Sequence, residues 1–149
     1  MSDLDPLVRL LAIEDIRVLR AQYWRFVDTK AWEEFGKLFT PTCYFTNHES
    51  NYTFAGNDQM RDQIRRILGE VFTFHAGHQS EITILDETHA SGIWAISDYL
   101  VFPEHVEYPA DPEIKTIRSV GYYFDTYEKV DDRWLFAGID FHRMRTDKQ

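Results

Sequence analysis

The chain has 149 residues, of which 44 % are hydrophobic and 15 % aromatic, so it has enough apolar side chains for one well-packed core. Its net charge of −9 excludes the basic surface that nucleic-acid binding requires. A lone cysteine allows no intrachain disulfide, and the sequence shows no signal peptide and no apolar stretch of the roughly 18 residues that a membrane helix needs. We therefore expect a single cytoplasmic domain over residues 1–149, with neither nucleic acid nor a membrane as partner.

Helical periodicity dominates the first half of the chain. Asp5 and Pro6 are typical of an N-cap and a first-turn proline, and apolar residues then recur at spacings of four and three as far as Phe26. The other elements expected in this half are a short helix at 31–39, a strand at 43–47, and a third helix that starts after residues 55–58 and runs to residue 71.

From residue 80 onwards the hydrophobic period changes to two, which predicts β-strands. Residues 103–113 contain three prolines and form a loop long enough to be a lid or a partner contact. Helices followed by antiparallel strands indicate an α+β domain, and a strongly bent sheet around the helices would leave a cavity between them. The four expected strands are 80–85, 91–102, 119–130 and 134–145.

Asp98 is predicted to lie among large apolar residues on one face of its strand. With a period of two, it shares that face with Trp94, Ile96, Leu100 and Phe102. A carboxylate buried in this way needs a proton, hydrogen bonds or a cation. The alternative is that strand twist or a bulge turns Asp98 outward.

Tyr23 and Asp28 lie near the end of the first predicted helix. Tyr23 is on its apolar face, where it could be a core residue or a hydrogen-bonding group of a pocket. On an ideal helix Asp28 would lie about 140° around from Tyr23. The two share a site only if the helix ends near Val27 and the chain turns. Otherwise Asp28 is a helix-terminal residue or the cap of the next helix.

Two histidines, His75 and His78, lie in the segment "FTFHAGHQSEITIL". As metal ligands they would need a shared face and a third donor, whereas a strand directs residues three apart to opposite faces. His48, Glu49 and Cys43 are further donors, but no metal-binding motif contains them, and we expect no metal ion and no cofactor. A nucleophile elbow and a phosphate-binding glycine loop are also missing. The remaining histidine, carboxylates and tyrosine suit proton abstraction.

The order of these motifs resembles the SnoaL-like branch of the nuclear transport factor 2-like superfamily, which includes scytalone dehydratase, bile-acid dehydratase and hexachlorocyclohexane dehydrochlorinase. The likeness rests on "YWRFVDTKAWEEFGKLFTPTCYF", "FHAGHQ" and "GYYFDTYEKVDDRWLFAG", and it covers roughly residues 5–145. It implies a strongly curved mixed or antiparallel sheet wrapped around N-terminal helices, as a cone-shaped, cystatin-like barrel with an internal pocket. The likeness does not specify the reaction, because the superfamily hosts many activities.

Carried over to this sequence, the histidine–aspartate pair of the family falls on His75 and Asp28. The bile-acid dehydratase type adds a tyrosine five residues before the aspartate, here Tyr23, and an aspartate on the following long strand, here Asp98. The scytalone dehydratase type instead has a second histidine after that strand, where this chain has His105 in a proline-rich loop. His78 matches no functional position and is interpreted as a rim or scaffold residue.

The resemblance implies a cofactor-independent lyase or dehydratase acting on a hydrophobic, cyclic carbonyl compound. His75 would be the base, oriented by Asp28. Tyr23 would bind the carbonyl or leaving oxygen, and Asp98 would help to protonate the leaving hydroxyl or orient the substrate. Isomerisation or polyketide cyclisation in the same pocket, and a non-catalytic ligand-binding or oxygenase-partner domain, stay open as alternatives. The expected pocket lining is Trp94, Phe102, Tyr44, Phe54, Phe72 and Phe124.

A homodimer or small homo-oligomer is also implied by the resemblance, through the exposed side of the sheet. Tyr122, Phe124 and Phe141 are the candidate contact residues, and the sequence does not decide which strand face is outward.

Overall fold

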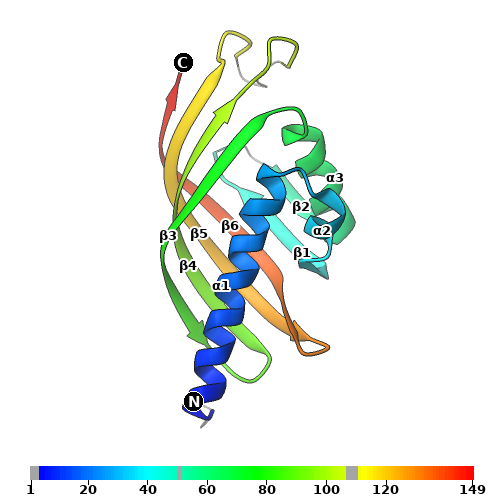
Figure 1. The fold of residues 1–149 in the computed structure, drawn as a ribbon, viewed down its shortest axis with the longest axis vertical. Helices are drawn as coiled ribbons and strands as arrows, with labels where there is room; N and C mark the ends of the chain where they lie inside the picture. Colours follow the sequence, from blue (N-terminus) through cyan, green and yellow to red (C-terminus); the bar gives the residue numbers. More distant parts are fainter. Residues whose placement is uncertain (1–3, 50–51, 107–110) are drawn as a thin grey trace.

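The computed structural model describes residues 4–49, 52–106 and 111–149. Within these ranges, three helices accompany one six-stranded sheet with the strand order β2-β1-β6-β5-β4-β3 (Figure 1). The helices are α1 (Pro6–Asp28), α2 (Trp32–Gly36) and α3 (Asn57–Leu68). The strands are β1 (Phe39–Asn47), β2 (Tyr52–Ala55), β3 (Phe72–Ile84), β4 (His89–Val101), β5 (Thr116–Val130) and β6 (Arg133–Lys148).

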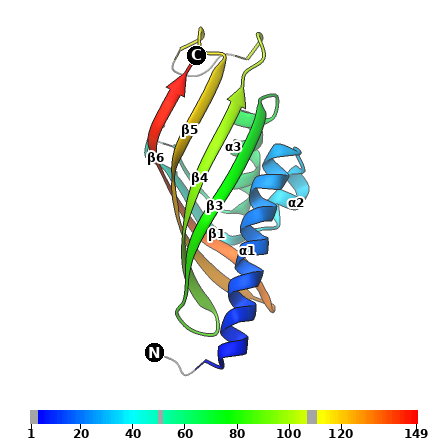
Figure 2. The same cartoon turned by 60° about the vertical axis from the view of Figure 1, so that its left-hand side comes forward.

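The sheet is mixed and strongly curved. Strands β3 to β6 form an antiparallel meander, whereas β1 joins β6 in parallel and carries β2 on its other side. The long helix α1 lies along the concave side of the sheet, and α2 and α3 lie next to each other beside it (Figure 2). The predicted α+β class, with a curved sheet around N-terminal helices, is therefore confirmed.

Helix α1 begins as the sequence predicts. The Asp5 carboxylate accepts hydrogen bonds from the backbone N–H groups of Leu7, at 2.7 Å, and Val8, and Pro6 occupies the first turn. The apolar face of the helix packs on the sheet. Near the end of the helix, however, the buried residue is Val27, whereas Phe26, which was expected on the apolar face, is only half-buried. No helix in the described ranges is both long and apolar enough to cross a membrane.

The core also contains a fully buried ion pair that joins α1 to β5. Arg20 donates from Nη2 to Oδ1 of Asp125 over 3.1 Å, and both side chains are 0 % exposed. The guanidinium lies 3.9 Å from the ring centre of Tyr123 and 4.5 Å from that of Tyr23. The other oxygen of Asp125 accepts a hydrogen bond from the Tyr127 hydroxyl at 2.7 Å. These contacts fix α1 against the middle of the sheet.

The strands differ from the prediction where regular alternation breaks down. Strand β3 begins at Phe72 instead of residue 80, because an irregularity between Gly77 and Ser80 interrupts the period of two. The short strand β2 was not predicted at all, and the helix expected over 31–39 ends at Gly36. The earlier start of β3 places His75 inside a strand.

Alternation in β4 and β5 follows the predicted period. Asp98 is only 6 % exposed, so its side chain points inward and the outward alternative is not realised. On β5, Tyr122 and Phe124 are exposed on the outer face. Phe141 of β6, which was grouped with them as a candidate contact, is 3 % exposed and faces inward. It is therefore no candidate for contacts of the exposed side of the sheet.

Candidate active site

A cavity of about 450 Å³ lies between the helices and the concave face of the sheet. This volume is in the range of small-molecule sites. Its apolar wall includes Phe45, Ile64, Leu100, Phe102 and Phe141. Its polar side chains include Tyr23, His75, Asp98, Tyr123 and Arg143. The cavity thus combines an apolar wall with several polar and charged groups.

Asp28 lies next to His75, a residue of the cavity wall, at the point where α1 ends. The next residues turn the chain, with Lys30 in the left-handed region at φ 61°. The N-cap of α2 is Ala31, so Asp28 does not cap the following helix. This early stop is the condition under which Asp28 and Tyr23 were predicted to share a site.

Three hydrogen-bond donors converge on the Asp28 carboxylate. They are the Thr73 hydroxyl at 2.8 Å, the backbone N–H of His75 at 2.9 Å and Nδ1 of His75 at 2.6 Å. An ionised carboxylate only accepts hydrogen bonds, so Nδ1 of His75 carries the proton of the neutral ring and Nε2 keeps its lone pair. The His75 side chain is 8 % exposed and lines the cavity. Asp28 therefore fixes the orientation of the His75 ring at the wall of the cavity.

Lys30 fixes the chain segments on which this pair is built. Its Nζ donates to the carbonyl oxygens of Leu68, at 2.8 Å, and Val71, at 2.6 Å, and reaches the Thr73 hydroxyl at 3.3 Å. Burial lowers the pKa of Lys30, and the negative charge of Asp28 acts against that shift. The ammonium thus ties the turn after α1 to the segment that leads into β3.

A second charged pair lies across the cavity wall. Asp98 is the β4 residue directly opposite His75 in the strand register. Asp98 accepts hydrogen bonds from the Ser119 hydroxyl at 2.5 Å and from Nη2 of Arg143 at 3.2 Å. Burial alone would lower the pKa of Arg143, but the neighbouring negative charges, chiefly Asp98, hold the pKa above its ordinary value. The cavity therefore contains a permanent cation.

Two buried tyrosines also belong to the polar lining, which further includes Asn47, Glu49, Arg66 and Lys148. Tyr23 extends from α1 and Tyr123 from β5, with ring centres 6.3 Å apart, and Tyr123 stacks on Phe141 at 4.2 Å. Burial raises the pKa of Tyr23 well above its usual value and raises the pKa of Tyr123 to about 12. Both hydroxyls thus stay protonated and can donate hydrogen bonds.

Of the predicted aromatic lining, Phe102 lines the cavity. Trp94 and Phe54 are buried elsewhere in the core, contrary to the prediction. Trp94 donates from its indole nitrogen to the Tyr127 hydroxyl at 3.0 Å, and Phe54 stacks behind Phe45 at 5.9 Å. These two rings support the wall without lining the cavity.

The other three predicted lining residues lie outside. Tyr44, Phe72 and Phe124 are 45 %, 58 % and 43 % exposed. Tyr44 and Phe124 each occupy the outward position between two inward residues of their strands, and Phe72 is the first residue of an edge strand. Their aromatic character had suggested that these residues line the pocket, but it does not indicate which face of the sheet a residue occupies.

The remaining histidines near this region do not line the cavity. His78 is exposed and its Nε2 is 3.0 Å from the Ser97 hydroxyl, and His105 is exposed with its Nε2 3.3 Å from a Glu70 oxygen. Val106, from the loop expected to be a lid or a partner contact, does line the cavity. Residues 107–110 of that loop lie outside the described residues.

Arg143 and Tyr123 were not identified from the sequence. The signal for Arg143 was present, because it follows Ile139 and Phe141 at a period of two on β6. The same reasoning had placed Asp98 inside on β4. Tyr123 carried a weaker signal, since a tyrosine on an apolar strand face is most often a core residue.

The curved six-stranded sheet wrapped around a long N-terminal helix matches the cone-shaped fold of the nuclear transport factor 2-like class of domains. Within that class, the model of the SnoaL-like domain matches residues 8–140, and the chain belongs to this family. The resemblance noted from the sequence is confirmed.

The chain is similar to a curated protein in sequence and to solved structures in fold, all at low sequence identity. "Probable cyclase FGR4" of Gibberella zeae is 21 % identical over an alignment of 135 residues, which covers 84 % of this chain and 86 % of that protein. A type 2 hexachlorocyclohexane dehydrochlorinase has a TM-score of 0.84 at 17 % identity, covering 97 % of this chain and 93 % of its own. The type 3 enzyme of Novosphingobium barchaimii has a TM-score of 0.82 at 16 % identity, covering 97 % and 94 %.

Proposed function

We propose that this protein is a cofactor-independent lyase of the dehydratase type, which eliminates water from a hydrophobic, cyclic β-hydroxy carbonyl compound. The observation that carries the proposal is the orientation of His75, whose Nδ1 is bound by Asp28 while the ring lines a cavity with both apolar and polar walls. Two of the structural relatives are named as dehydrochlorinases, enzymes that also eliminate a leaving group, and another is named "Putative Scytalone Dehydratase".

The first step is proton abstraction. Nε2 of His75 removes a proton from the carbon next to the substrate carbonyl, and the electron pair of that C–H bond moves into an enolate. Asp28 stabilises the imidazolium that forms. The protonated Tyr23 hydroxyl donates a hydrogen bond to the enolate oxygen, where negative charge develops.

The second step is loss of the hydroxyl group. The enolate electrons form the carbon–carbon double bond, the carbon–oxygen bond breaks, and the imidazolium of His75 returns its proton so that water leaves. The Arg143 guanidinium stabilises the departing oxygen. Of the two roles considered for Asp98, the hydrogen bonds from Ser119 and Arg143 favour orientation over proton donation.

The test is a screen of cyclic β-hydroxy ketones, with the ultraviolet absorbance of the conjugated enone as readout. His75→Gln and Asp28→Asn are each expected to lower kcat by about 10²–10⁴-fold, because a positioned acid–base group contributes that much. His78→Gln is the matched control, since it changes an exposed histidine three residues away and should keep activity. Wild-type turnover in Asp28→Asn or His75→Gln would refute the assignment.

Isomerisation or cyclisation is the second candidate, supported by the relative named as a cyclase. Both reactions start with the same proton abstraction beside a carbonyl. Analysis of the product from one accepted substrate, by NMR in deuterated water, separates them. Dehydration gives an enone with loss of the oxygen, whereas isomerisation and cyclisation conserve the oxygen or form a ring.

A purely ligand-binding domain would use the same polar groups as a structural network. In that case Asp28→Asn should lower the free energy of unfolding by several kcal/mol, because buried donors would lose their partner. A catalytic pair is expected to cost little stability on removal, or even to raise it. Thermal unfolding of the wild type and of Asp28→Asn therefore distinguishes the two functions without a known substrate.

A further inference from the structure

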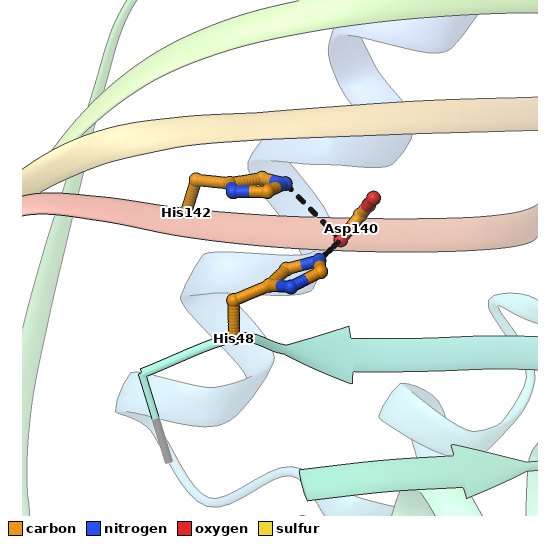
Figure 3. A group of neighbouring side chains, drawn as sticks. All are labelled: His48, Asp140 and His142. Atoms are coloured by element: carbon orange, nitrogen blue, oxygen red, sulfur yellow. Dashed lines mark hydrogen bonds and ion pairs between the residues drawn. The ribbon is translucent and has the colours of Figure 1, made fainter. Parts of the chain in front are cut away.

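His48, Asp140 and His142 lie together on the outer face of the sheet, away from the residues that line the cavity (Figure 3). We propose that these three side chains bind a divalent transition-metal ion of the Zn²⁺ type. The inference does not depend on the proposed enzymatic function, because Asp140 and His142 point away from the cavity, whereas Phe141 between them lines it.

The fold brings the three residues together through two strands. Asp140 and His142 are two apart on β6 and therefore share a face. His48 follows the end of β1, whose parallel register pairs Asn47 with Phe141. The backbone N–H of His48 also donates to the carbonyl oxygen of Phe141 at 3.3 Å. The sheet thus fixes the three Cα positions, and binding of a metal ion would require only small changes of the side-chain torsion angles.

Both imidazoles direct Nε2 to the same carboxylate oxygen. Nε2 of His142 is 3.4 Å from Oδ1 of Asp140, and Nε2 of His48 contacts that oxygen directly. The two rings stack with centres 4.0 Å apart and planes 18° apart, and the edge-on ring of Phe124 holds His142 from the other side at 5.5 Å. This arrangement presents two nitrogen donors and one oxygen donor toward one point.

The spacing of the donors suits one metal ion. The three ligand atoms all lie within 4.8 Å of one another. Zn²⁺ binds histidine nitrogen at about 2.0–2.1 Å and carboxylate oxygen at about 2.0–2.2 Å, so two donors on one ion are separated by up to roughly 4 Å. Small rotations of these exposed side chains would bring all three donor atoms within this separation.

The donor types select the class of metal. Imidazole nitrogen favours Zn²⁺, Co²⁺, Ni²⁺ and Cu²⁺, whereas Mg²⁺ and Ca²⁺ prefer sites made of oxygen. The side chains of His48, Asp140 and His142 are 49 %, 38 % and 45 % exposed, which leaves room for water on the remaining coordination positions. The net charge of −9 also favours cation binding over anion binding.

Ordinary surface ion pairs do not have this geometry. His89 with Asp86, and His105 with Glu70, each combine one histidine with one carboxylate. Among the described residues, no other group of three such donors lies this close together. A pair offers too few donors to hold a metal at low concentration, so these pairs supply matched controls.

Calorimetric titration of the tag-free protein with ZnCl₂ tests the proposal, with MgCl₂ as the comparison ion. We expect one equivalent of Zn²⁺ to bind and Mg²⁺ not to bind. His48→Gln, Asp140→Asn and His142→Gln should each weaken Zn²⁺ binding at least about tenfold, since second-sphere changes alone cost that much at metal sites. His89→Gln should leave the affinity unchanged.

His75→Gln separates this site from the cavity and should also leave the affinity unchanged. The proposal is overturned if the wild type takes up no Zn²⁺, if only His75→Gln abolishes uptake, or if His89→Gln weakens it as much as His48→Gln does. A second readout is the visible spectrum of bound Co²⁺, which the three ligand variants should lose. Metal-free melting curves of these variants that match the wild type would show that each remains folded.

Discussion

Among the described residues, Thr73 is the one donor to Asp28 that does not belong to His75. Its hydroxyl donates to Oδ1 of Asp28 and lies near Nζ of Lys30. Thr73→Val keeps the shape of the side chain and removes this hydrogen bond. We expect kcat to fall about tenfold, because hydrogen bonds to a charged group contribute roughly 1.5–3 kcal/mol and part of that loss is absorbed by rearrangement. KM should change little, since Thr73 does not line the cavity.

The serine variant provides the control for this positioning role. Thr73→Ser keeps the hydroxyl and should restore most of kcat, although it loses the methyl group. Steady-state kinetics on one accepted substrate measure both parameters. Equal impairment of Thr73→Ser and Thr73→Val would show that packing at this position matters and the hydrogen bond does not.

Single residues of the site were predictable where an unusual side chain interrupts a regular pattern. Asp98 was predicted to point inward because its strand face is otherwise apolar, and it is buried. The meeting of Asp28 with His75 could not be derived from periodicity. It depends on the left-handed residue Lys30 and on a strand that begins eight residues earlier than predicted, at Phe72. Both are tertiary features with no periodic signal.

Helix α1 packs tightly against strand β3 at Gly77, where the Trp24 ring occupies the space of a side chain. A Cβ atom on Gly77 would lie 1.9 Å from a ring carbon of Trp24. Gly77→Ala must therefore displace α1 or the buried indole, and we expect the free energy of unfolding to fall by about 1–3 kcal/mol or more, the usual cost of overfilling a core. Urea unfolding measures this change.

Gly36→Ala is the matched control, because its Cβ would meet only the flexible side chain of Arg61 at 3.2 Å. It is expected to change stability by much less than Gly77→Ala. Combining Gly77→Ala with Trp24→Leu should recover part of the loss, since the smaller side chain vacates the space. An unaltered unfolding midpoint in Gly77→Ala would contradict the close packing described here.

Elements with a long regular period were predicted well, and those shaped by contacts with other elements were not. The period of α1 and the alternation of β4, β5 and β6 are continuous over many residues, and their bounds lie close to those predicted. Strand β3 loses its alternation next to Gly77, where the Trp24 ring of α1 leaves no room for a side chain. The sequence of β3 is thus governed by a helix that lies far away along the chain.

Across the whole molecule, Arg20 and Asp125 join the helix to the sheet at a separation of 105 residues. Removing one partner of a buried ion pair leaves an uncompensated charge and typically costs about 3–5 kcal/mol. Arg20→Met should therefore destabilise the protein by about this amount. Adding Asp125→Asn should recover part of the loss, because the orphaned charge disappears. Equal stability of the single and double variants would contradict a role for that charge.

The same variant gives a pH prediction. Burial raises the pKa of Asp125 to about 6, although Arg20 lowers it, so loss of Arg20 raises the pKa further. A carboxyl group with a raised folded-state pKa binds its proton more tightly in the folded protein, and stability is lost as pH rises through that pKa. The stability deficit of Arg20→Met relative to wild type should thus be smaller near pH ~5 than near pH ~8, as urea unfolding would measure.

The sequence could not reveal this pair. An arginine beside an apolar helix stripe is usually interpreted as a surface residue whose stem covers the core. Its guanidinium is surrounded by the aromatic rings of Tyr23, Trp24, Tyr123 and Phe136, which come together only when the helix packs on the sheet. The overall α+β architecture was predictable because the order of helices and strands restricts the topology, whereas buried charge depends on distant partners.

The Asp28 carboxylate binds both the ring and the backbone N–H of His75. Strand β3 is an edge of the sheet, so this amide is protected by the carboxylate of a helix instead of by a neighbouring strand. Deuterium exchange at this one amide consequently reports whether the base is aligned, before any substrate is known. A single backbone resonance can thus serve to rank variants, inhibitors and solution conditions by how well they preserve an assembled site.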